Sequence, residues 1–155
     1  MSEIRRSRPR VSALDICAQA VLEVETRGEG FTDLTREARA FLVEVGARDG
    51  MLHLFCRHTS ASLTIQENAD PDVRVDLLTA LRRLAPAGHP WVHHLEGPDD
   101  MPAHIRTALT ASDVSIPVAE GALRLGTWQA VYLIEHRTRP HTREVVLCFC
   151  GAARD

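Results

Sequence analysis

The chain has 155 residues, of which 45% are hydrophobic and 25% are charged, and these proportions of an ordinary globular domain exclude a disordered or fibrous protein. Its formal net charge of −3 argues against a nucleic-acid-binding protein, which needs a basic face. No apolar run approaches the ~20 residues of a membrane span, so we expect neither a membrane nor a nucleic acid as a partner.

The sequence is interpreted as a short basic tail followed by one domain. Residues 1–11 contain the run RRSRPR, and a short basic run near a terminus is typical of a solvated, flexible tail. The remaining residues, 12–155, have the length of a single domain. Because the N-terminus has a basic start but no apolar leader segment, the expected location is the cytoplasm.

The four cysteines show neither CxxC spacing nor the density of a disulfide scaffold. We therefore interpret Cys17, Cys56, Cys148 and Cys150 as reduced and mostly buried. Cys148 and Cys150 are two apart in an apolar run, which places both on one face of a strand. Core packing is favoured there over metal binding.

The first third of the chain predicts two long strands around a helix. Residues 12–26 alternate between apolar and polar side chains, which indicates a strand with one wet face. Apolar residues then recur at helical spacing over residues 33–46, with a capping residue at the start and a glycine at the end. The Asp-Gly pair at 49–50 is typical of a turn, and the apolar run at 51–58 predicts a buried strand.

The middle of the chain predicts one strand and two helices. After a strand at 63–66, an Asp-Pro pair starts a helix over residues 70–85, because aspartate caps free N–H groups and proline lacks one. A helix over residues 99–109 starts in a similar way, and Asp100 and His104 are one turn apart on it. Its apolar side chains are expected to face the core: Ile105, Ala108 and Leu109.

After residue 112 the pattern becomes one of short strands. Apolar segments at 114–118, 122–126, 127–137 and 143–151 are separated by glycine- and proline-containing turns. Several short strands with polar turns indicate antiparallel pairing. The predicted fold class is therefore α+β, with two packed antiparallel β-sheets in a sandwich-like arrangement and about three helices.

Four of the eight histidines lie in two segments rich in carboxylates and hydroxyls. His58 at a strand end, His93 in an extended segment and His104 on a short helix can converge, because strand ends and loops bring distant residues together. Two or three histidines with a carboxylate bind a divalent metal and leave a position open. The alternative for each ring is a hydrogen-bonded, half-buried side chain. His94 points away from His93, so at most one of the pair faces the site.

The hydroxyl-rich residues 59–62 allow two interpretations. Serine and threonine at the end of a strand commonly satisfy backbone groups. They can also form a cradle for an anion or phosphate, to which Arg137 would add a bidentate clamp. Glu67 falls at the end of the following strand and is a candidate acid or base. A serine nucleophile with His58 as its base lacks the GxSxG motif and stays a minor alternative.

Three long motifs, HTSASLTIQENADPDVRVD, HHLEGPDDMPAHIRTAL and LGTWQAVYLIEHR, resemble in this order the YjbQ-like family, also known as the secondary thiamine-phosphate synthase family. The resemblance extends from about Leu14 to Gly151. It implies a compact homotrimer with sites near the subunit boundaries, and it selects His93 over His94. The family's motif residues fall on His58, Thr59, Ser60, Glu67, Asn68, Asp70, Asp76, His93, Glu96, Asp100, His104, Gln129, Glu135 and Arg137.

The residues and the resemblance together give three sets of expected roles. The expected catalytic groups are His58, Glu67, His93 and His104. The expected ligands of a divalent metal, zinc or magnesium, are His58, His93, Asp100 and His104. The expected substrate- and phosphate-binding residues are Thr59, Ser60, Asn68, Gln129 and Arg137.

The resemblance implies an enzyme that joins hydroxymethylpyrimidine diphosphate to thiazole phosphate with loss of pyrophosphate. The metal and Arg137 would neutralise the leaving pyrophosphate. Two alternatives stay open: a metal-dependent hydrolase of an anionic or phosphorylated metabolite, and a non-catalytic trimeric protein that binds a small molecule. The expected partners are the chain itself, in a homotrimer, and an anionic small-molecule substrate.

Overall fold

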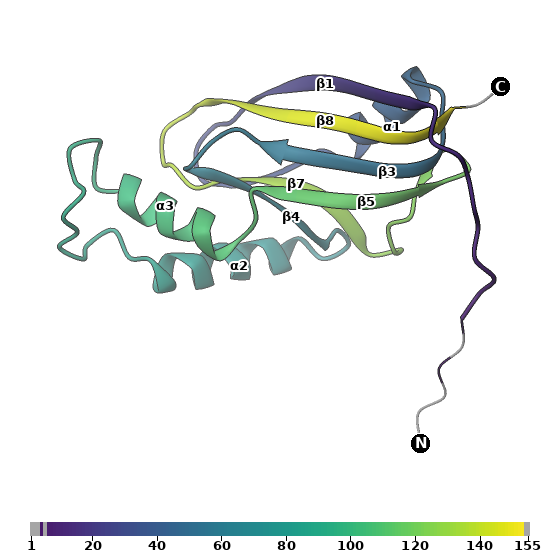
Figure 1. Ribbon diagram of the computed structural model, residues 1–155. Coiled ribbons are helices and arrows are strands. Elements are labelled where there is room, and N and C mark those ends of the chain that lie inside the picture. Colours follow the sequence, from purple (N-terminus) through teal and green to yellow (C-terminus); the bar gives the residue numbers. More distant parts are fainter. Residues whose placement is uncertain (1–3, 5, 154–155) are drawn as a thin grey trace.

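A computed structural model shows how the alternating segments pair into sheets (Figure 1). It describes residues 4 and 6–153; residues 1–3 and 5 of the expected tail, and 154 and 155 at the end of the expected domain, lie outside the described residues. The predicted α+β fold, with two antiparallel sheets and three helices, is confirmed. No helix of the described chain is both long enough and apolar enough to cross a membrane.

The larger sheet has five strands in the order β1-β8-β3-β5-β6, and every neighbouring pair is antiparallel. Its strands are β1 (Ile16–Glu25), β3 (Ala47–Cys56), β5 (Asp113–Ala119), β6 (Ala122–Leu123) and β8 (Thr142–Ala153). The smaller sheet, also antiparallel, has the order β2-β7-β4. Its strands are β2 (Gly30–Asp33), β4 (Ala61–Glu67) and β7 (Gln129–Glu135). The helices are α1 (Thr35–Glu44), α2 (Pro71–Leu84) and α3 (Asp100–Leu109).

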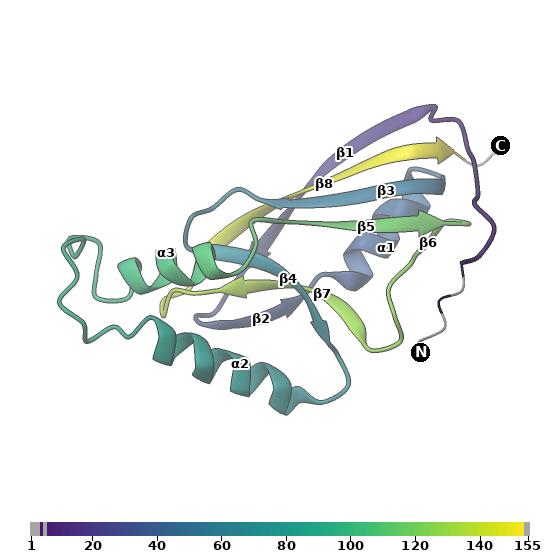
Figure 2. The same ribbon diagram turned by 60° about the horizontal axis from the view of Figure 1, so that its bottom comes forward.

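The hydrophobic core joins the two sheets and α1. Alternate residues of β3 and β8 are buried, as the period of two along a strand requires. The core side chains include Leu54 from β3, Leu63 from β4, Leu133 from β7, Phe149 from β8 and Leu42 from α1. Figures 1 and 2 show α2 and α3 together on the side of the smaller sheet, away from this core.

The Asp-Gly pair at 49–50 is not a turn, because β3 runs through it. Gly50 and Gly151 are partners across β3 and β8, and a Cβ atom on Gly50 would lie 2.4 Å from the carbonyl oxygen of Cys150. Glycine is therefore required by close approach of the two strands. The sequence interpretation also missed β2, whose four residues are too short to show an alternation.

Helix α2 starts as predicted, since the Asp70 side chain accepts a hydrogen bond from the N–H of Asp72 at 2.9 Å. None of its residues is buried, however, and its apolar residues Val75 and Leu84 are 59% and 65% exposed. Figure 2 shows α2 lying outside β2 and beside α3. Within one chain, these two apolar side chains are therefore uncovered, whereas Val73, Leu77, Leu78 and Leu81 are half-buried.

Three of the four cysteines contradict the prediction that they are mostly buried. Only Cys56 is buried, whereas Cys17 is exposed and Cys148 and Cys150 are half-buried. In β8 the inward positions belong to alternate residues such as Phe149, so Cys148 and Cys150 lie on the outer face of the larger sheet.

Candidate functional site

His93, Asp100 and His104 converge at the start of α3, and we call them the histidine cluster. The Asp100 Oδ2 atom lies 2.7 Å from His93 Nε2 and 3.1 Å from His104 Nε2. One ligand atom from each residue lies within 4.8 Å of the others. Asp100 is 1% exposed, while His93 is exposed and His104 half-buried, so the cluster has a buried carboxylate and an open side.

The backbone at Thr59 determines which nitrogen of His104 faces Asp100. His104 Nδ1 lies 2.9 Å from the Thr59 carbonyl oxygen, and only an N–H can donate to a carbonyl. In the neutral ring, Nε2 is then a bare acceptor facing another acceptor, the Asp100 carboxylate. A metal ion bound between the two acceptors would relieve this opposition. A backbone carbonyl that fixes the tautomer in this way is typical of metal-ligating histidines.

Arg137 contacts the Asp100 carboxylate at the oxygen that does not face the histidines. Its Nη1 donates to Asp100 Oδ1, its Nε donates to Asp99 Oδ2 at 3.2 Å, and its Nη2 donates to the Glu96 carbonyl at 2.8 Å. The side chain is buried, so its guanidinium is committed to partners within the protein. In this structure Arg137 therefore orients two carboxylates, and its phosphate-binding role stays a prediction.

Either Asp99 or Asp100 was expected to cap α3, but the N-cap residue is Asp99 and its side chain makes no capping hydrogen bond. Its carboxylate accepts hydrogen bonds from the backbone N–H of Thr138 at 2.8 Å and from Arg137. Burial alone raises the pKa of Asp99, but these hydrogen bonds outweigh it and lower the pKa to about 2. Because Asp100 turns inward with Ala103 and Arg106, the apolar Ala108 and Leu109 are exposed, which contradicts their predicted core positions.

His58 lies outside the histidine cluster. Its Nε2 accepts the backbone N–H of Glu144 at 2.7 Å, so Nδ1 carries the hydrogen and the neutral ring has no free lone pair. Burial is the main cause that lowers the pKa of His58. The structure therefore does not bring His58 together with His93, Asp100 and His104, and its metal-ligand and catalytic roles stay predictions.

The serine hydroxyls of the predicted anion cradle form hydrogen bonds with other side chains of the protein. Ser60 is buried, and its Oγ accepts a hydrogen bond from Arg143 Nη2 at 3.0 Å. Arg143 also pairs with the buried carboxylate of Glu135 at 2.6 Å. Ser60 therefore satisfies a buried arginine, and its phosphate-binding role stays a prediction. Thr59 is exposed, and its carbonyl supports His104.

Glu67, Asn68 and Gln129, which we call the amide end, lie far from the histidine cluster in one chain. In the β4–β7 pair Glu67 is the partner of Gln129, whereas Ala61, within the hydroxyl-rich residues 59–62, is the partner of Glu135. Six residue steps along β4 correspond to roughly 20 Å. One chain therefore divides the residues of the predicted site between the two ends of the smaller sheet.

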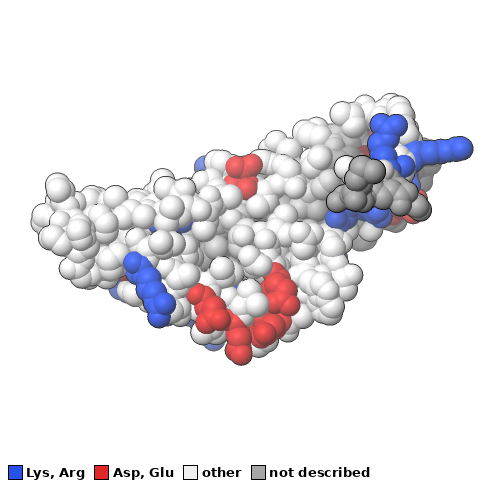
Figure 3. All heavy atoms as spheres, turned by 90° about the horizontal axis from the view of Figure 1, so that it is seen from below, with Lys and Arg blue, Asp and Glu red and all other residues white. Residues whose placement is uncertain are grey.

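The surroundings of the amide end are acidic. Figure 3 shows acidic side chains gathered on the face seen from below. Asp70, Asp72 and Asp76, which follow Asn68 along the chain, are exposed. Asn68 and Gln129 are also exposed, although Gln129 Oε1 accepts the N–H of Gly126 at 2.8 Å. An anion at this end would need a compensating positive charge.

The sequence interpretation missed a buried polar network around His136. His136 is 1% exposed, and its Nε2 lies 2.8 Å from Ser62 Oγ, which accepts a hydrogen bond from Thr110 Oγ1 at 2.7 Å. Burial is the main cause that lowers the pKa of His136 to about 4. Because these residues are far apart in the sequence, no spacing could indicate the network.

The pKa of His136 predicts that acid destabilises the fold. In the unfolded chain the pKa of this histidine is near the ordinary value of about 6.5, so the unfolded state binds a proton at a pH where the folded state does not. The free energy of unfolding therefore falls as the pH drops from about 6.5 to about 4. The free energy of unfolding is expected to be about 2 kcal/mol lower at pH 5 than at pH 7, with His58 acting in the same direction. Urea denaturation at the two pH values measures this difference.

The matched variants for this measurement are His136→Gln and the exposed His94→Gln. Glutamine keeps a hydrogen-bonding group beside Ser62 but does not titrate, so His136→Gln should lose most of the difference between pH 5 and pH 7. His94→Gln should keep it. An unchanged difference in His136→Gln would show that the acid sensitivity comes from other groups.

Comparison with known proteins gives consistent matches over most of the chain. The sequence profile of the family described as UPF0047 protein YjbQ-like matches residues 20–152. A UPF0047 protein of Synechocystis is 48% identical over 134 residues, which cover 86% of this chain and 91% of the relative. The UPF0047 protein YjbQ of Escherichia coli O157:H7 is 37% identical, covering 86% of this chain and 97% of the relative.

A solved structure supports the same grouping. The crystal structure of a hypothetical protein from Aeropyrum pernix K1 superposes with a TM-score of 0.80 at 30% identity. The superposition covers 87% of this chain and 99% of the other. The sheets and helices described above are therefore shared with that protein over nearly its whole length.

Proposed function

The chain belongs to the UPF0047 family of YjbQ-like proteins, and we propose that it is a metal-dependent enzyme of the thiamine-phosphate synthase type. Such an enzyme joins hydroxymethylpyrimidine diphosphate to thiazole phosphate with loss of pyrophosphate. The observation that carries the proposal is the histidine cluster, in which Nε2 of His93 and Nε2 of His104 lie 2.7 Å and 3.1 Å from the same carboxylate oxygen of Asp100.

The donor atoms of the histidine cluster fit zinc better than magnesium. Two imidazole nitrogens and one carboxylate oxygen are a common zinc ligand set, whereas magnesium prefers oxygen ligands alone. The exposed side at His93 leaves room for a further ligand. When bound, a divalent metal supplies positive charge that stabilises a leaving pyrophosphate.

The chain's own residues prepare the cluster for this role. Arg137 keeps the Asp100 carboxylate oriented. Its guanidinium donates a hydrogen bond to Oδ1, so that Oδ2 points to both imidazoles. Thr59 fixes the ring of His104 through its carbonyl. Since these supports are in place without a ligand, little reorganisation opposes binding.

We also propose that the protein is a homotrimer in which a neighbouring chain brings its amide end to the histidine cluster. Two observations support a shared site: the two groups are separated by roughly 20 Å within one chain, and two apolar side chains of α2, Val75 and Leu84, are exposed. The amides of Asn68 and Gln129, exposed in one chain, would then hold the substrate opposite the metal.

The expected location and partners form part of the same proposal. The substrate is a small anionic metabolite, and the location is the cytoplasm. The acidic group seen in Figure 3 repels nucleic-acid phosphates, which supports a small-molecule partner over a nucleic acid.

Product formation in purified protein tests this function. Zinc-loaded protein supplied with both substrates should form thiamine phosphate, and chelator-treated protein should not. His104→Ala and Gln129→Ala should each lower turnover at least about tenfold. The control is His94→Ala, because His94 lies beside the cluster but its Nδ1 contacts the carbonyl of Val92. Unchanged turnover in His104→Ala would remove the cluster from the reaction.

Mixing His104→Ala with Gln129→Ala tests separately whether the site is shared between chains. If the chains are dissociated and reassembled together, some subunit boundaries will combine an intact histidine cluster with an intact amide end, and turnover should recover well above that of either variant. A mixture no more active than its components would refute the shared site and leave the metal site standing.

The open side of the cluster also favours one other candidate, a metal-dependent hydrolase of a phosphorylated metabolite, because a metal with an open position can activate water. Omitting the thiazole substrate separates the two functions. Metal-dependent phosphate or pyrophosphate release under that condition indicates a hydrolase, and dependence on the thiazole indicates the synthase.

A further inference from the structure

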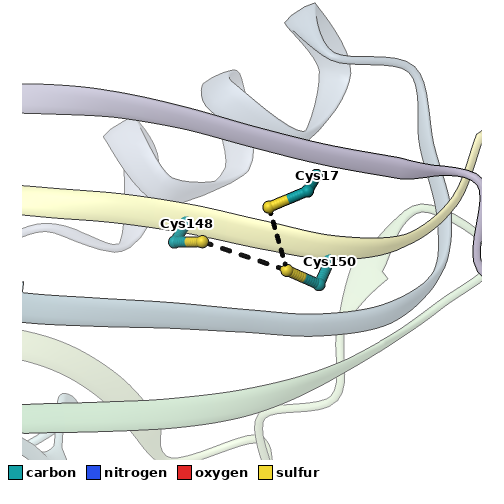
Figure 4. A group of neighbouring side chains, drawn as sticks. All are labelled: Cys17, Cys148 and Cys150. Atoms are coloured by element: carbon teal, nitrogen blue, oxygen red, sulfur yellow. Dashed lines mark hydrogen bonds between the residues drawn. The ribbon is translucent and has the colours of Figure 1, made fainter.

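Three cysteines from two strands form a compact group on the outer face of the larger sheet. Cys17 of β1 and Cys150 of β8 are direct partners in the antiparallel register. Cys148 is two residues away along β8 and therefore on the same face. The Sγ atoms of Cys17 and Cys150 are 3.2 Å apart, and those of Cys148 and Cys150 are 4.0 Å apart. Figure 4 shows the three sulfur atoms turned toward one another.

We propose that Cys17, Cys148 and Cys150 form a second metal site, which binds Cu(I) through three thiolates. Soft thiolate ligands select copper(I) among the common cellular metals, together with zinc. In a trigonal site with metal–sulfur bonds of about 2.3 Å, as known for zinc thiolates, neighbouring sulfur atoms lie about 4 Å apart. All three sulfur atoms lie within 4.8 Å of one another, so small side-chain rotations are sufficient.

The number and kind of donors favour Cu(I) over zinc. Structural zinc sites have four ligands, whereas the group among the described residues consists of three sulfur atoms. The partner of Cys150 on its other side, in β3, is Met51, which is 43% exposed. Directly paired residues share a face of the sheet, so a thioether, another soft donor, belongs to the same surface.

The backbone and the surface around the group suit metal exchange. Cys148 and Cys150 lie in a central strand that is bonded to β1 on one side and β3 on the other, which holds their positions firmly. Cys17 is exposed, so a metal can arrive from solvent. Each thiol gives up its proton to solvent when it binds. The site involves none of the residues of the histidine cluster and does not depend on the proposed function.

Copper competition tests the site in fully reduced protein under anaerobic conditions. Protein is titrated into Cu(I) held by a chromophoric chelator, and the loss of the chelator colour measures transfer. We expect one Cu(I) per chain, an ultraviolet absorption band from thiolate-to-copper charge transfer, and at least a tenfold loss of affinity in Cys17→Ser, Cys148→Ser and Cys150→Ser. Because Cys17 is exposed, Cys17→Ser should fold like the wild type, which circular dichroism checks.

Two variants serve as controls. Cys56→Ala removes the buried cysteine that lies outside the group, and His104→Ala removes a residue of the histidine cluster. Both should keep the Cu(I) affinity of the wild type. Failure to compete with the chelator, or binding that survives replacement of all three cysteines, would overturn the proposal. It would also be overturned if air forms a disulfide between Cys17 and Cys150 while the reduced protein takes up no Cu(I).

Discussion

Arg137→Met is expected to lower the free energy of unfolding by about 3–5 kcal/mol, the range for a buried ion pair that loses one partner. Asp99 and Asp100 are both buried, and Arg137 donates hydrogen bonds to both. Methionine fills similar space but leaves two carboxylates without their cation. Urea denaturation at neutral pH measures the loss.

The matched control for this prediction is Arg139→Met, two residues away on the same segment. Arg139 is exposed, so its replacement should change the free energy of unfolding by no more than about 0.5 kcal/mol. Adding Asp100→Asn to Arg137→Met should recover part of the loss, because one unpaired charge is removed. A loss below about 1 kcal/mol in Arg137→Met would mean that the two carboxylates do not depend on this arginine.

His104→Ala is expected to weaken zinc binding by about 100-fold or more, and His93→Ala by a similar factor, since even the loss of a group that only supports a ligand costs 10–100-fold. Each substitution removes one of three donor groups. Competition with a chromophoric zinc chelator measures the affinity. Because thiolates also bind zinc, the experiment requires a Cys17→Ser, Cys150→Ser background.

His94→Ala in the same background is the control, and its zinc affinity should equal that of the parent. Thr59 supports His104 through its backbone carbonyl, so Thr59→Ala should also bind zinc normally. If His104→Ala retains the parent affinity, the convergence of the three side chains has no role in metal binding.

Local features of this fold could be predicted from the sequence because their partners are close along the chain. Asp70 caps α2, and Asp100 meets His104 one helical turn away, as their spacing indicated. The alternation of β1 likewise predicted a strand with one wet face. The regular spacing of strands and turns was sufficient to predict two antiparallel sheets.

Features that depend on distant partners could not be predicted in the same way. Arg137 was expected to clamp a bound phosphate, but its guanidinium pairs with two carboxylates of the protein, 37 and 38 residues away in the sequence. The motif from His58 to Asn68 appeared to be one site, yet strand β4 runs through it and separates its ends by roughly 20 Å. Cys148 and Cys150 were correctly placed on one face, but the sequence does not say which face is buried.

Anomalous X-ray diffraction at the zinc edge, from crystals of Cys17→Ser, Cys150→Ser protein grown with zinc, tests the metal site most directly. The proposal predicts one peak per chain between His93 Nε2, His104 Nε2 and Asp100 Oδ2, with residues of the amide end of a neighbouring chain facing it. A peak at other residues, or no peak at a zinc concentration that saturates the protein, would contradict the metal-dependent function.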